Sequence, residues 1–587
     1  MTYALAAALA MLGCALGSWG LRWGLPDSRR IERVLPPGMD PAALHRQLAD
    51  SWTAMHKKLG DNLMLSPEAF KPFSGVERIK PGWTWPPPVL MNSVRSFHLR
   101  SGHDDEQTWL IILSRMKPWK GDLRTHMFTY GGAHIYSMGA ALAVGAVLGL
   151  VELKSSVLPY LADPPKMAAM YMAGRVLSVA MYVACGLMLL RIGRRRLGQG
   201  PRGVRVGALA ALFFLLSPAA IVQAHVLKNH MFWSFFALWT LDLSLGLLET
   251  GGALRYAAAG AAAGLALGSF LVAWPACLVV AAAACVRLAA GRGSWKDEAA
   301  GLTAAAAAAL AAFLATNPYW VLDFREAVAE MSVLGGSAGG VSAAKAIQFL
   351  LFTMPPSVTE PALALTLAGC CWAAWKNRKE PAWLLCLLAF ALGLSVASTL
   401  SMVSTVRLVR YFLAWTAVGQ LLAAKAAWEL FDRGVWGRRL GGAVIAAATL
   451  QLAAAGLTYA YNFHAASTPR STHYLAGDWI EANLPPEAVV GMLATPAPSN
   501  APYFRYDRYE LMIIEAPLFK DLMPPELPRF LVVALPDFDL RPSLGTNFTR
   551  YERMVRFERP TLLPWMRVHP SAMTANPVFE VYRLRAR

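Results

Sequence analysis

Long apolar stretches decide the fold of this chain, and the clearest one, residues 255–290, reads RYAAAGAAAGLALGSFLVAWPACLVVAAAACVRLAA. Its only charged side chains are Arg255 and Arg287, one near each end. About 20 apolar residues cross a bilayer, so this stretch is long enough for two passes with Pro275 near the turn. The sequence therefore predicts a polytopic α-helical membrane protein.

The composition of the whole chain agrees with this prediction. Of its 587 residues, 56% are hydrophobic and 16% are charged, and the mean hydropathy is +0.39. Soluble domains carry about 25% charge, so a disordered, fibrous or ordinary cytosolic protein is excluded. All seven cysteines lie in apolar runs without CxxC pairs, which argues against a disulfide framework or a zinc site.

Apolar stretches of spanning length recur along the chain, and they predict about eleven membrane spans. The predicted spans are 3–22, 169–190, 206–225, 231–249, 255–271, 274–290, 299–316, 357–375, 381–400, 407–428 and 440–460. Residues 131–150 are a twelfth candidate, and hydropathy alone slightly favours their crossing. Residues 1–21 contain no Lys or Arg, so we expect an uncleaved first span rather than a signal peptide.

Short loops rich in Lys and Arg mark the cytoplasmic side of a membrane protein. Four such loops, at 191–205, 287–298, 376–380 and 432–439, together hold 15 cations and 4 acids. Even numbers of predicted spans separate them, so we expect all four on the cytoplasmic side and the C-terminal tail outside. The formal net charge of +18 is then mainly an orientation signal, and nucleic-acid binding is not expected.

Four domains follow from this pattern. They are a first transmembrane helix (1–23), a segment (24–168) that starts in the cytoplasm if 131–150 crosses the membrane and lies outside if it does not, a transmembrane bundle (169–460) and a small C-terminal α/β domain (461–587). In the last domain we expect a helix at 471–483 followed by short strands. The predicted strands are Ala488–Leu493, Tyr509–Ile514, Phe530–Leu535 and Val578–Leu584.

The densest chemical signal is the run His103-Asp104-Asp105-Glu106 in the segment 24–168. Adjacent carboxylates can act as a general base, or hold a divalent cation beside a phosphate. They can equally be a solvated helix N-terminus, where the helix dipole favours acids. Composition alone favours this second interpretation.

Several motifs in order along the chain resemble the GT-C superfamily of membrane glycosyltransferases, in its protein mannosyltransferase-like and aminoarabinose transferase-like branch. That family carries an acidic motif often written HPDE, which Asp105 and Glu106 match while Asp104 replaces proline. Further matches are Phe128-Thr129-Tyr130-Gly131-Gly132, Gly174-Arg175-Val176-Leu177-Ser178, Arg410-Tyr411-Phe412-Leu413-Ala414, and Thr468, Arg470, Ala476, Trp479, Ile480, Asn483 and Pro485.

This resemblance implies a GT-C-like bundle with a large first outer loop, in which 131–150 lies on the outer surface. One departure concerns residues 225–230, where relatives carry a second Asp. Here Asn229 or His230 stands at that place, and His230 could still hydrogen-bond or ligate. The loss of this acid puts metal dependence and activity in question.

The resemblance also implies inverting transfer of a sugar from a polyprenyl-phosphate carrier to an acceptor at the outer face. Asp105 is then the expected general base, supported by Glu106, and the two acids are candidate ligands of a divalent cation such as Mg²⁺ or Mn²⁺. Arg410, Arg407 and Lys228 are candidates for the donor phosphate, or interfacial residues with no such role. The further site candidates are Asp104, His103, His230 and Tyr130.

Other interpretations remain open on the sequence. A transporter or flippase of lipid-linked material would place ionisable residues at the bilayer midplane and show repeated halves. An inactive relative acting as an assembly partner would explain the missing acid. We expect Asp242 to make a helix–helix contact and residues 335–340, which are rich in glycine, to form a mobile outer loop. For an active enzyme, a bacterial inner membrane with the site on the periplasmic side is expected.

Overall fold

The computed structural model describes residues 2–59, 75–198, 200–335, 342–376, 380–399, 409–535, 541–566, 568 and 575–585. The chain divides into two compact units. The membrane unit comprises Met1–Trp19, Met116–Ala141 and Gly174–Ala460. The sheet unit comprises Gly20–Arg115, Leu142–Ala173 and Tyr461–Arg587. The two units do not coincide with the four predicted domains, because each unit consists of three segments that are distant in the sequence.

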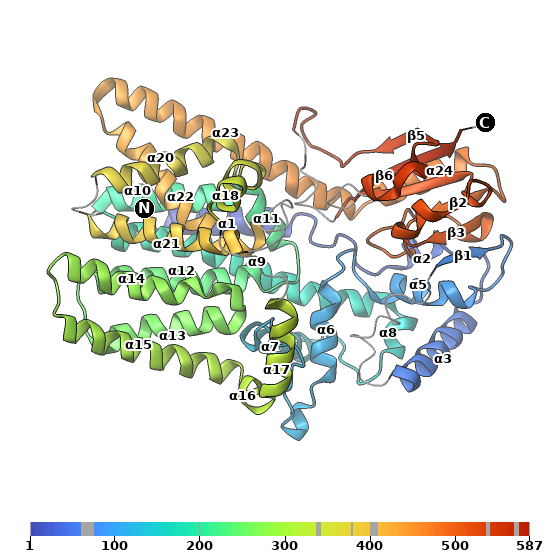
Figure 1. The fold of residues 1–587 in the computed structure, drawn as a ribbon, viewed down its shortest axis with the longest axis horizontal. Helices are drawn as coiled ribbons and strands as arrows, with labels where there is room; N and C mark the ends of the chain where they lie inside the picture. The colour runs from blue at the N-terminus through green and yellow to red at the C-terminus, as the bar shows by residue number, and fades with distance from the viewer. Residues whose placement is uncertain are drawn as a thin grey trace. The chain divides into compact units, whose positions relative to one another are not determined.

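Helices make up the membrane unit (Figure 1), and α7, α9 and α23 each also include residues that belong to the sheet unit. In chain order they are α1 (Thr2–Ser18), α7 (Gly132–Val147), α9 (Pro164–Arg196), α10 (Gly200–Leu216), α11 (Pro218–Ala224), α12 (His230–Leu247), α13 (Ala253–Ser269), α14 (Pro275–Ala289), α15 (Trp295–Thr316), α16 (Tyr319–Leu322), α17 (Phe324–Gly335), α18 (Ala343–Gln348), α19 (Pro355–Val358), α20 (Glu360–Lys376), α21 (Pro381–Thr399), α22 (Val409–Phe431) and α23 (Gly434–Ala466). Each of the eleven predicted spans falls on one of these helices or on an adjacent pair.

Four helical segments of the described chain are long and apolar enough to cross a membrane: α9, Leu271–Ala289, α15 and α23. The pair α10 and α11 would make a fifth, although the two helices meet at 63°. Several other predicted spans correspond to shorter apolar helices, such as α1 and α21. The apolar helices indicate an integral membrane protein.

The bend between α10 and α11 interrupts what the sequence predicted as one span, 206–225. Pro218 stands at the first position of α11, where it has no N–H to continue the hydrogen bonds of α10. The Ser217 hydroxyl caps the new helix by accepting the Ala220 N–H at 3.4 Å. The turn that follows α11 carries residues 225–230.

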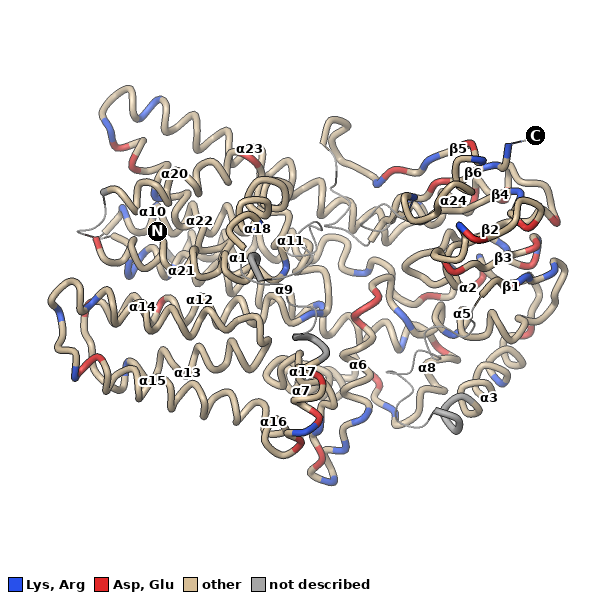
Figure 2. The backbone as a smooth tube through the Cα atoms, viewed as in Figure 1, with Lys and Arg blue, Asp and Glu red and all other residues tan. Residues whose placement is uncertain are grey.

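Small residues bring α13 and α15 into backbone contact. A Cβ on Gly260 would lie 2.1 Å from the Ala305 carbonyl oxygen, and one on Gly264 would lie 2.2 Å from that of Ala309. Glycines spaced four residues apart allow helices in a membrane to pack this closely. The Gly/Ala-rich stretch that predicted the fold is therefore also the packing face of α13. In Figure 2 both helices are free of charged residues over most of their length.

A mixed six-stranded sheet organises the sheet unit, in the order β1-β3-β2-β4-β6-β5. Its strands are β1 (Val76–Ile79), β2 (Val489–Met492), β3 (Glu510–Ile514), β4 (Phe530–Leu535), β5 (Tyr551–Phe557) and β6 (Val578–Leu584). The strands β2, β3, β4 and β6 confirm the four predicted strands, and α24 (Thr472–Asn483) confirms the predicted helix. The sequence analysis missed β1 and β5.

The missed strand β1 joins two segments that the sequence treated as separate domains. It pairs antiparallel with β3, from Val76 opposite Ile514 to Ile79 opposite Leu511. The helices α2 (Ser28–Glu32), α3 (Pro41–Leu59) and α5 (Pro88–Leu99) also belong to this unit. Leu48 and Phe97 share one apolar core with Val490, Tyr503 and Phe579. The first loop and the C-terminal segment therefore form one folded body.

Candidate functional site

The acidic motif stands at the start of α6 (Glu106–Arg115) in the sheet unit. The Asp105 N–H donates to Nδ1 of His103 at 3.1 Å, and the Glu106 N–H donates to the His103 carbonyl at 3.3 Å. The His103 N–H donates in turn to the Ser101 hydroxyl at 3.1 Å. The His103 side chain thus accepts a backbone N–H and shapes the turn that carries Asp105.

The three acids of the motif have different surroundings. Asp104 is exposed and accepts a hydrogen bond from the Ser499 hydroxyl. Asp105 is half-buried, and Glu106 is fully buried with 0% exposure. A base that must reach a substrate hydroxyl needs both access and a fixed position. Asp105 meets this requirement better than its neighbours do.

Two glycines and a buried arginine hold the segment just before the motif. The Gly102 N–H donates to the Gly24 carbonyl at 2.7 Å, and a Cβ on Gly24 would lie 2.9 Å from Cα of Gly102. The Arg30 guanidinium donates to the carbonyls of Gly24 at 3.0 Å and Phe97 at 2.6 Å, and also to that of Arg100. Arg30 thereby caps the C-terminal carbonyls of α5 and ties them to the chain that follows α1.

Sequence reasoning missed Arg30 and Arg100. Burial lowers the pKa of the Arg30 guanidinium, which is 2% exposed. Burial also lowers the pKa of Arg100, and this effect is opposed by the Tyr171 hydroxyl and the Asp104 carboxylate. The sequence could have indicated the start of α2, because Asp27 caps that helix by accepting the Arg30 N–H at 2.9 Å. The long-range contacts of its side chain have no counterpart in the sequence pattern.

Aromatic rings gather at one end of the membrane unit, which we call the aromatic end (Tyr130, His230, Phe270, Arg410 and Tyr411). Phe270 stacks against Tyr130 at 5.7 Å between centroids and against Tyr411 at 5.6 Å. His230 meets both Phe270 and Tyr411 edge-on, each at 5.6 Å. The predicted candidates Tyr130, His230 and Arg410 are thus brought together by Phe270 and Tyr411, which the sequence did not single out as site residues.

Arg410 is ordered by its neighbour in the chain. Its guanidinium lies 4.9 Å from the centroid of the Tyr411 ring, and Nη2 donates to the Tyr411 hydroxyl at 2.9 Å. Such a cation–π contact orders a guanidinium without cancelling its charge. The ring and the hydroxyl of Tyr411 therefore both help to fix the direction of the Arg410 guanidinium.

The turn between α11 and α12 is buried. Lys228 is 2% exposed, Asn229 is 0% exposed, and the Asn229 side-chain amide donates to the Ser269 carbonyl at 2.9 Å. The oxygen of the same Asn229 amide is buried without a hydrogen-bond partner in the described part of the chain. In place of the acid expected from the resemblance, this chain therefore has an amide that holds α13 and a histidine that packs on aromatic rings.

The Tyr-Gly motif lies against the ends of two helices. The Gly131 N–H donates to the Ser269 carbonyl at 3.2 Å, and the Gly132 N–H donates to the Asn317 side chain at 2.7 Å. A Cβ on Gly131 would lie 1.8 Å from the Gly268 carbonyl oxygen. Only glycine fits at this approach, so the motif has a clear packing role.

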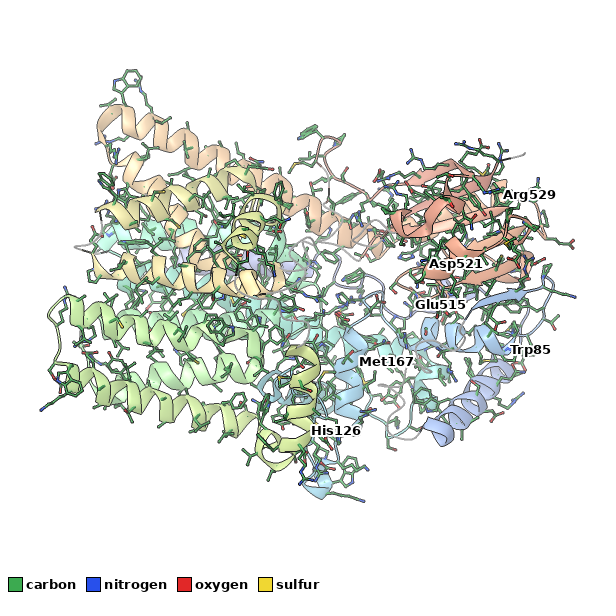
Figure 3. All side chains as sticks on the ribbon, viewed as in Figure 1. Trp85, His126, Met167, Glu515, Asp521 and Arg529 are labelled. Carbon is green, nitrogen blue, oxygen red and sulfur yellow. The ribbon has the colours of Figure 1, made fainter. Side chains whose placement is uncertain are left out.

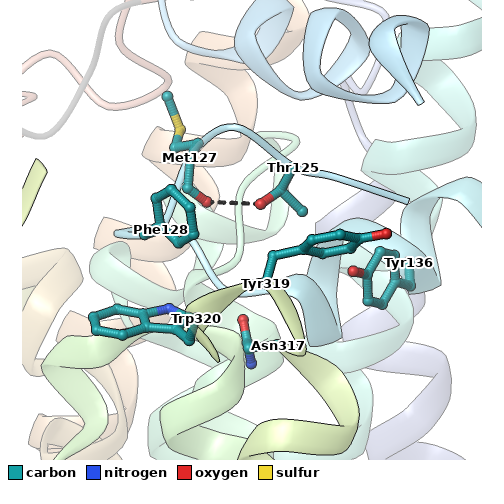
Figure 4. Close-up of a pocket in the computed structure, with 7 residues that line it drawn as sticks. All are labelled: Thr125, Met127, Phe128, Tyr136, Asn317, Tyr319 and Trp320. Carbon is teal, nitrogen blue, oxygen red and sulfur yellow. Dashed lines mark hydrogen bonds between the residues drawn. The ribbon is translucent and has the colours of Figure 1, made fainter. Parts of the chain in front are cut away.

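A small pocket lies beside this motif (Figure 4), lined by Thr125, Phe128, Tyr136, Asn317, Tyr319 and Trp320 among others. The Glu330 carboxylate of α17 accepts the backbone N–H groups of Phe128 and Thr129, both at 2.9 Å. His126, labelled in Figure 3, lies 3.9 Å from the Glu326 carboxylate of the same helix. These contacts fix α17 to the segment before Gly131.

The opposite end of the membrane unit, which we call the basic end, contains ion pairs whose carboxylates are buried. Asp242 accepts from Arg191 at 2.8 Å and lies 3.4 Å from Arg196, a helix–helix contact of the kind expected. Arg287 donates to Glu298 at 2.8 Å, and both side chains are less than 10% exposed. These pairs place several of the orientation cations in structural roles.

Two of the sequence predictions concern residues that the structure does not describe. Arg407 lies outside the described residues, as do residues 336–340 of the glycine-rich loop. Gly335 ends α17. Within the described residues, no three His, Cys, Asp or Glu side chains converge as a metal site would require.

Comparisons with known proteins gave matches among solved structures only. No protein-family model and no curated protein sequence matches the chain. ArnT from Cupriavidus metallidurans bound to undecaprenyl phosphate is similar at a TM-score of 0.44 and 14% identity, over 91% of this chain and 96% of ArnT.

Two further solved structures are similar over less of their own length. The archaeal oligosaccharyltransferase AglB from Archaeoglobus fulgidus, in complex with an inhibitory peptide and a dolichol-phosphate, is similar at a TM-score of 0.36 and 14% identity, over 61% of this chain and 50% of AglB. The mycobacterial arabinofuranosyltransferase AftD is similar at a TM-score of 0.37 and 14% identity, over 82% of this chain and 41% of AftD. The chain thus spans half the length of AglB.

Proposed function

We propose that this protein is an inverting glycosyltransferase that moves a sugar from a polyprenyl-phosphate carrier to an acceptor hydroxyl at the outer face of the membrane. The observation that carries the proposal is the position of Asp105. Its carboxylate is half-exposed between a solvent-facing Asp104 and a buried Glu106, on a turn that His103 shapes and that Arg30 ties down. The reaction class comes from the family resemblance, which rests on the order of the motifs along the sequence.

In this mechanism Asp105 takes the proton of the acceptor hydroxyl as the oxygen attacks the anomeric carbon. The bond from that carbon to the carrier phosphate breaks, and the configuration at the carbon inverts. The phosphate leaves as an anion, which Arg410 stabilises through its ordered guanidinium, with Lys228 and Arg407 as further candidates. His103, His230 and Tyr130 are further candidates for contacts with the substrate, and Asp104, whose side chain is exposed, is given no part in the transfer.

The predicted divalent cation stays a proposal. The chain would supply the carboxylates of Asp105 and Glu106, and Glu106 is fully buried. Mg²⁺ commonly completes its ligands with water and substrate phosphate, so two carboxylates suffice in principle. A bound Mg²⁺ or Mn²⁺ would neutralise phosphate charge, and every step above is assigned to this chain's own residues.

For the topology, we propose eleven spans in a bacterial inner membrane, with α7 along the outer surface and the sheet unit outside. Helix length does not distinguish α7, with 16 residues, from α1 and α13, with 17 residues each, so the placement of α7 rests on the family resemblance. A cysteine placed at Lys120 should react with an impermeant reagent added outside. Reaction only from the cytoplasm would overturn the assignment.

An alternative is an inactive relative that acts as an assembly partner. The amide at Asn229 and the packed ring of His230, where relatives have an acid, favour it. A transporter is less favoured, because Asp242 and Glu298 pair with arginines at the basic end.

The test is an assay of membranes that contain the protein, with a panel of radiolabelled polyprenyl-phosphate sugars. Transfer of label to an acceptor above that in control membranes supports the enzyme. Movement of the carrier across the membrane without transfer would support a transporter. No turnover with any donor would favour the assembly partner.

A further inference from the structure

A tight hairpin in the membrane unit presents an exposed tryptophan. The Lys117 N–H donates to the Asp122 carbonyl at 2.8 Å, and the Asp122 N–H donates back to the Lys117 carbonyl at 3.2 Å. Gly121 closes the turn in the left-handed conformation, with φ of 70°. The tip carries Trp119, which is 75% exposed, between the exposed side chains of Lys117 and Lys120.

The hairpin is fixed to α16. The Leu123 N–H donates to the Tyr319 hydroxyl at 2.9 Å, and the Tyr136 hydroxyl donates to the Leu123 carbonyl at 3.2 Å. Arg124 lies 3.6 Å from the Asp323 carboxylate, just after α16. The hairpin and α16 therefore form one surface.

Four large apolar side chains of the hairpin, α16 and the start of α17 are exposed, and we call them the apolar shelf: Trp119, Val321, Leu322 and Phe324. Each of them is more than 60% exposed. Several large exposed apolar residues in segments that are tied together indicate a contact with another apolar phase. The acids beside the shelf are engaged, since Asp122 and Asp323 lie near Arg124, and Glu326 lies near His126.

The position of the shelf just after α15 indicates that the apolar phase is the lipid bilayer. The 22 residues of α15 cover about 33 Å, close to the roughly 30 Å thickness of the hydrocarbon core, and 11% of its apolar window is buried. The chain leaves α15 at Thr316 and begins α16 at Tyr319. If α15 spans the bilayer, the shelf lies at the level of the lipid headgroups.

We propose that the apolar shelf inserts into the interfacial region of the leaflet at this end of α15, with Lys117 and Lys120 against anionic lipid headgroups. Tryptophan with flanking lysines suits that layer, because the ring is partly apolar and the ammonium groups reach phosphates. The shelf would hold the Phe128–Gly132 segment at a fixed depth. This proposal is independent of the proposed reaction.

The test uses the full-length protein in nanodiscs of phosphatidylcholine and phosphatidylglycerol, with the native cysteines replaced by alanine. Nitroxide labels are attached at Trp119→Cys, at Leu322→Cys and, as a control, at Met523→Cys in the sheet unit, where the native side chain is 63% exposed. We expect the labels at 119 and 322 to collide preferentially with oxygen, and the label at 523 to collide preferentially with a water-soluble nickel chelate. Because all three sites are exposed, none of the variants should unfold the protein.

Nickel accessibility at 119 and 322 equal to that at 523 would overturn the proposal. Shielding of 119 and 322 from both reagents would also overturn it, and would indicate a protein partner. The double change Lys117→Gln and Lys120→Gln should make the label at 119 shallower in the anionic nanodiscs but not in pure phosphatidylcholine. If the double change leaves the depth of the label at 119 unaltered in the anionic nanodiscs as well, Lys117 and Lys120 do not contact anionic headgroups.

Discussion

The two ends of the membrane unit use arginine in opposite ways. At the basic end, Arg287 meets the carboxylate of Glu298 at 2.8 Å, and Asp242 collects Arg191 and Arg196. At the aromatic end, Arg410 lies over the neutral ring of Tyr411 and donates to its hydroxyl. A carboxylate orders a guanidinium and adds an opposite charge, whereas an aromatic ring and a hydroxyl order it through contacts that carry no net charge. We infer that the first arrangement stabilises the fold, and under the proposed function the second orients Arg410 for the donor phosphate.

The largest effect on stability should come from breaking the pair at the basic end. Glu298→Gln leaves the buried Arg287 without its counter-charge, which typically costs about 3–5 kcal/mol. We expect a clearly lower thermal midpoint in detergent, with the turnover of the folded fraction unchanged. The double variant Arg287→Met and Glu298→Leu should recover most of the loss. If Glu298→Gln has the same thermal midpoint as wild type, the ion pair of Arg287 and Glu298 does not stabilise the fold.

In the sheet unit, buried histidines should set the response to acid. Burial lowers the pKa of His98 and of His473 to about 4, although Nδ1–H of each ring donates to a backbone carbonyl (Leu161 at 2.7 Å and Ala501 at 2.8 Å). Both folded-state values lie below the ordinary 6.5. The stabilisation is therefore complete above pH 6.5 and is lost as the pH falls towards 4, by up to about 3 kcal/mol for each residue.

The measurement is the thermal midpoint between pH 7 and pH 4, compared between wild type and His98→Asn. The variant should lose less stability on acidification, because asparagine does not titrate. Parallel curves for the two proteins would rule out His98 as a source of acid sensitivity.

At the aromatic end, Arg410→Ala should impair transfer rather than folding. Charge-assisted hydrogen bonds contribute about 1.5–3 kcal/mol, so kcat/KM should fall roughly 10- to 150-fold. The thermal midpoint should stay close to that of wild type, in contrast to Glu298→Gln. Arg439→Ala, a cation that stacks on Trp436, is a matched control that should leave transfer unchanged. Equal activity of both alanine variants would remove Arg410 from the site.

The smallest effect should follow from Tyr411→Phe. Phenylalanine keeps the ring beneath Arg410 and the contacts with His230 and Phe270, and it removes only the hydroxyl that accepts from Nη2. A neutral partner of this kind contributes about 1 kcal/mol, or a roughly fivefold change in the KM for the donor. A change in kcat alone would contradict a role in ordering Arg410 for phosphate binding.

The sequence predicted what depends on local pattern. Apolar stretches located the helices, and alternating or apolar runs located β2, β3, β4 and β6. The strand β1 escaped because it has four residues and its partner β3 lies more than 400 residues away in the chain. The edge strand β5 escaped because charged residues interrupt its alternation.

The site was predictable to a similar extent. The acidic motif and Arg410 stood out by residue type, but the difference in burial between Asp105 and Glu106 follows from tertiary packing. The aromatic end joins Tyr130, Phe270 and Tyr411 from distant segments, so no local pattern could reveal it. The carbonyl contacts of Arg30 are hidden for the same reason.

The central claim, that Asp105 is the base of a glycosyl transfer, is tested most directly by single-turnover transfer from the active radiolabelled donor. Asp105→Asn is compared with Asp104→Asn, an adjacent change of the same kind at an exposed side chain. The account predicts that Asp105→Asn slows transfer by about 10²- to 10⁴-fold while donor binding is kept, and that Asp104→Asn stays within a few-fold of wild type. Equal rates for wild type and Asp105→Asn would contradict it.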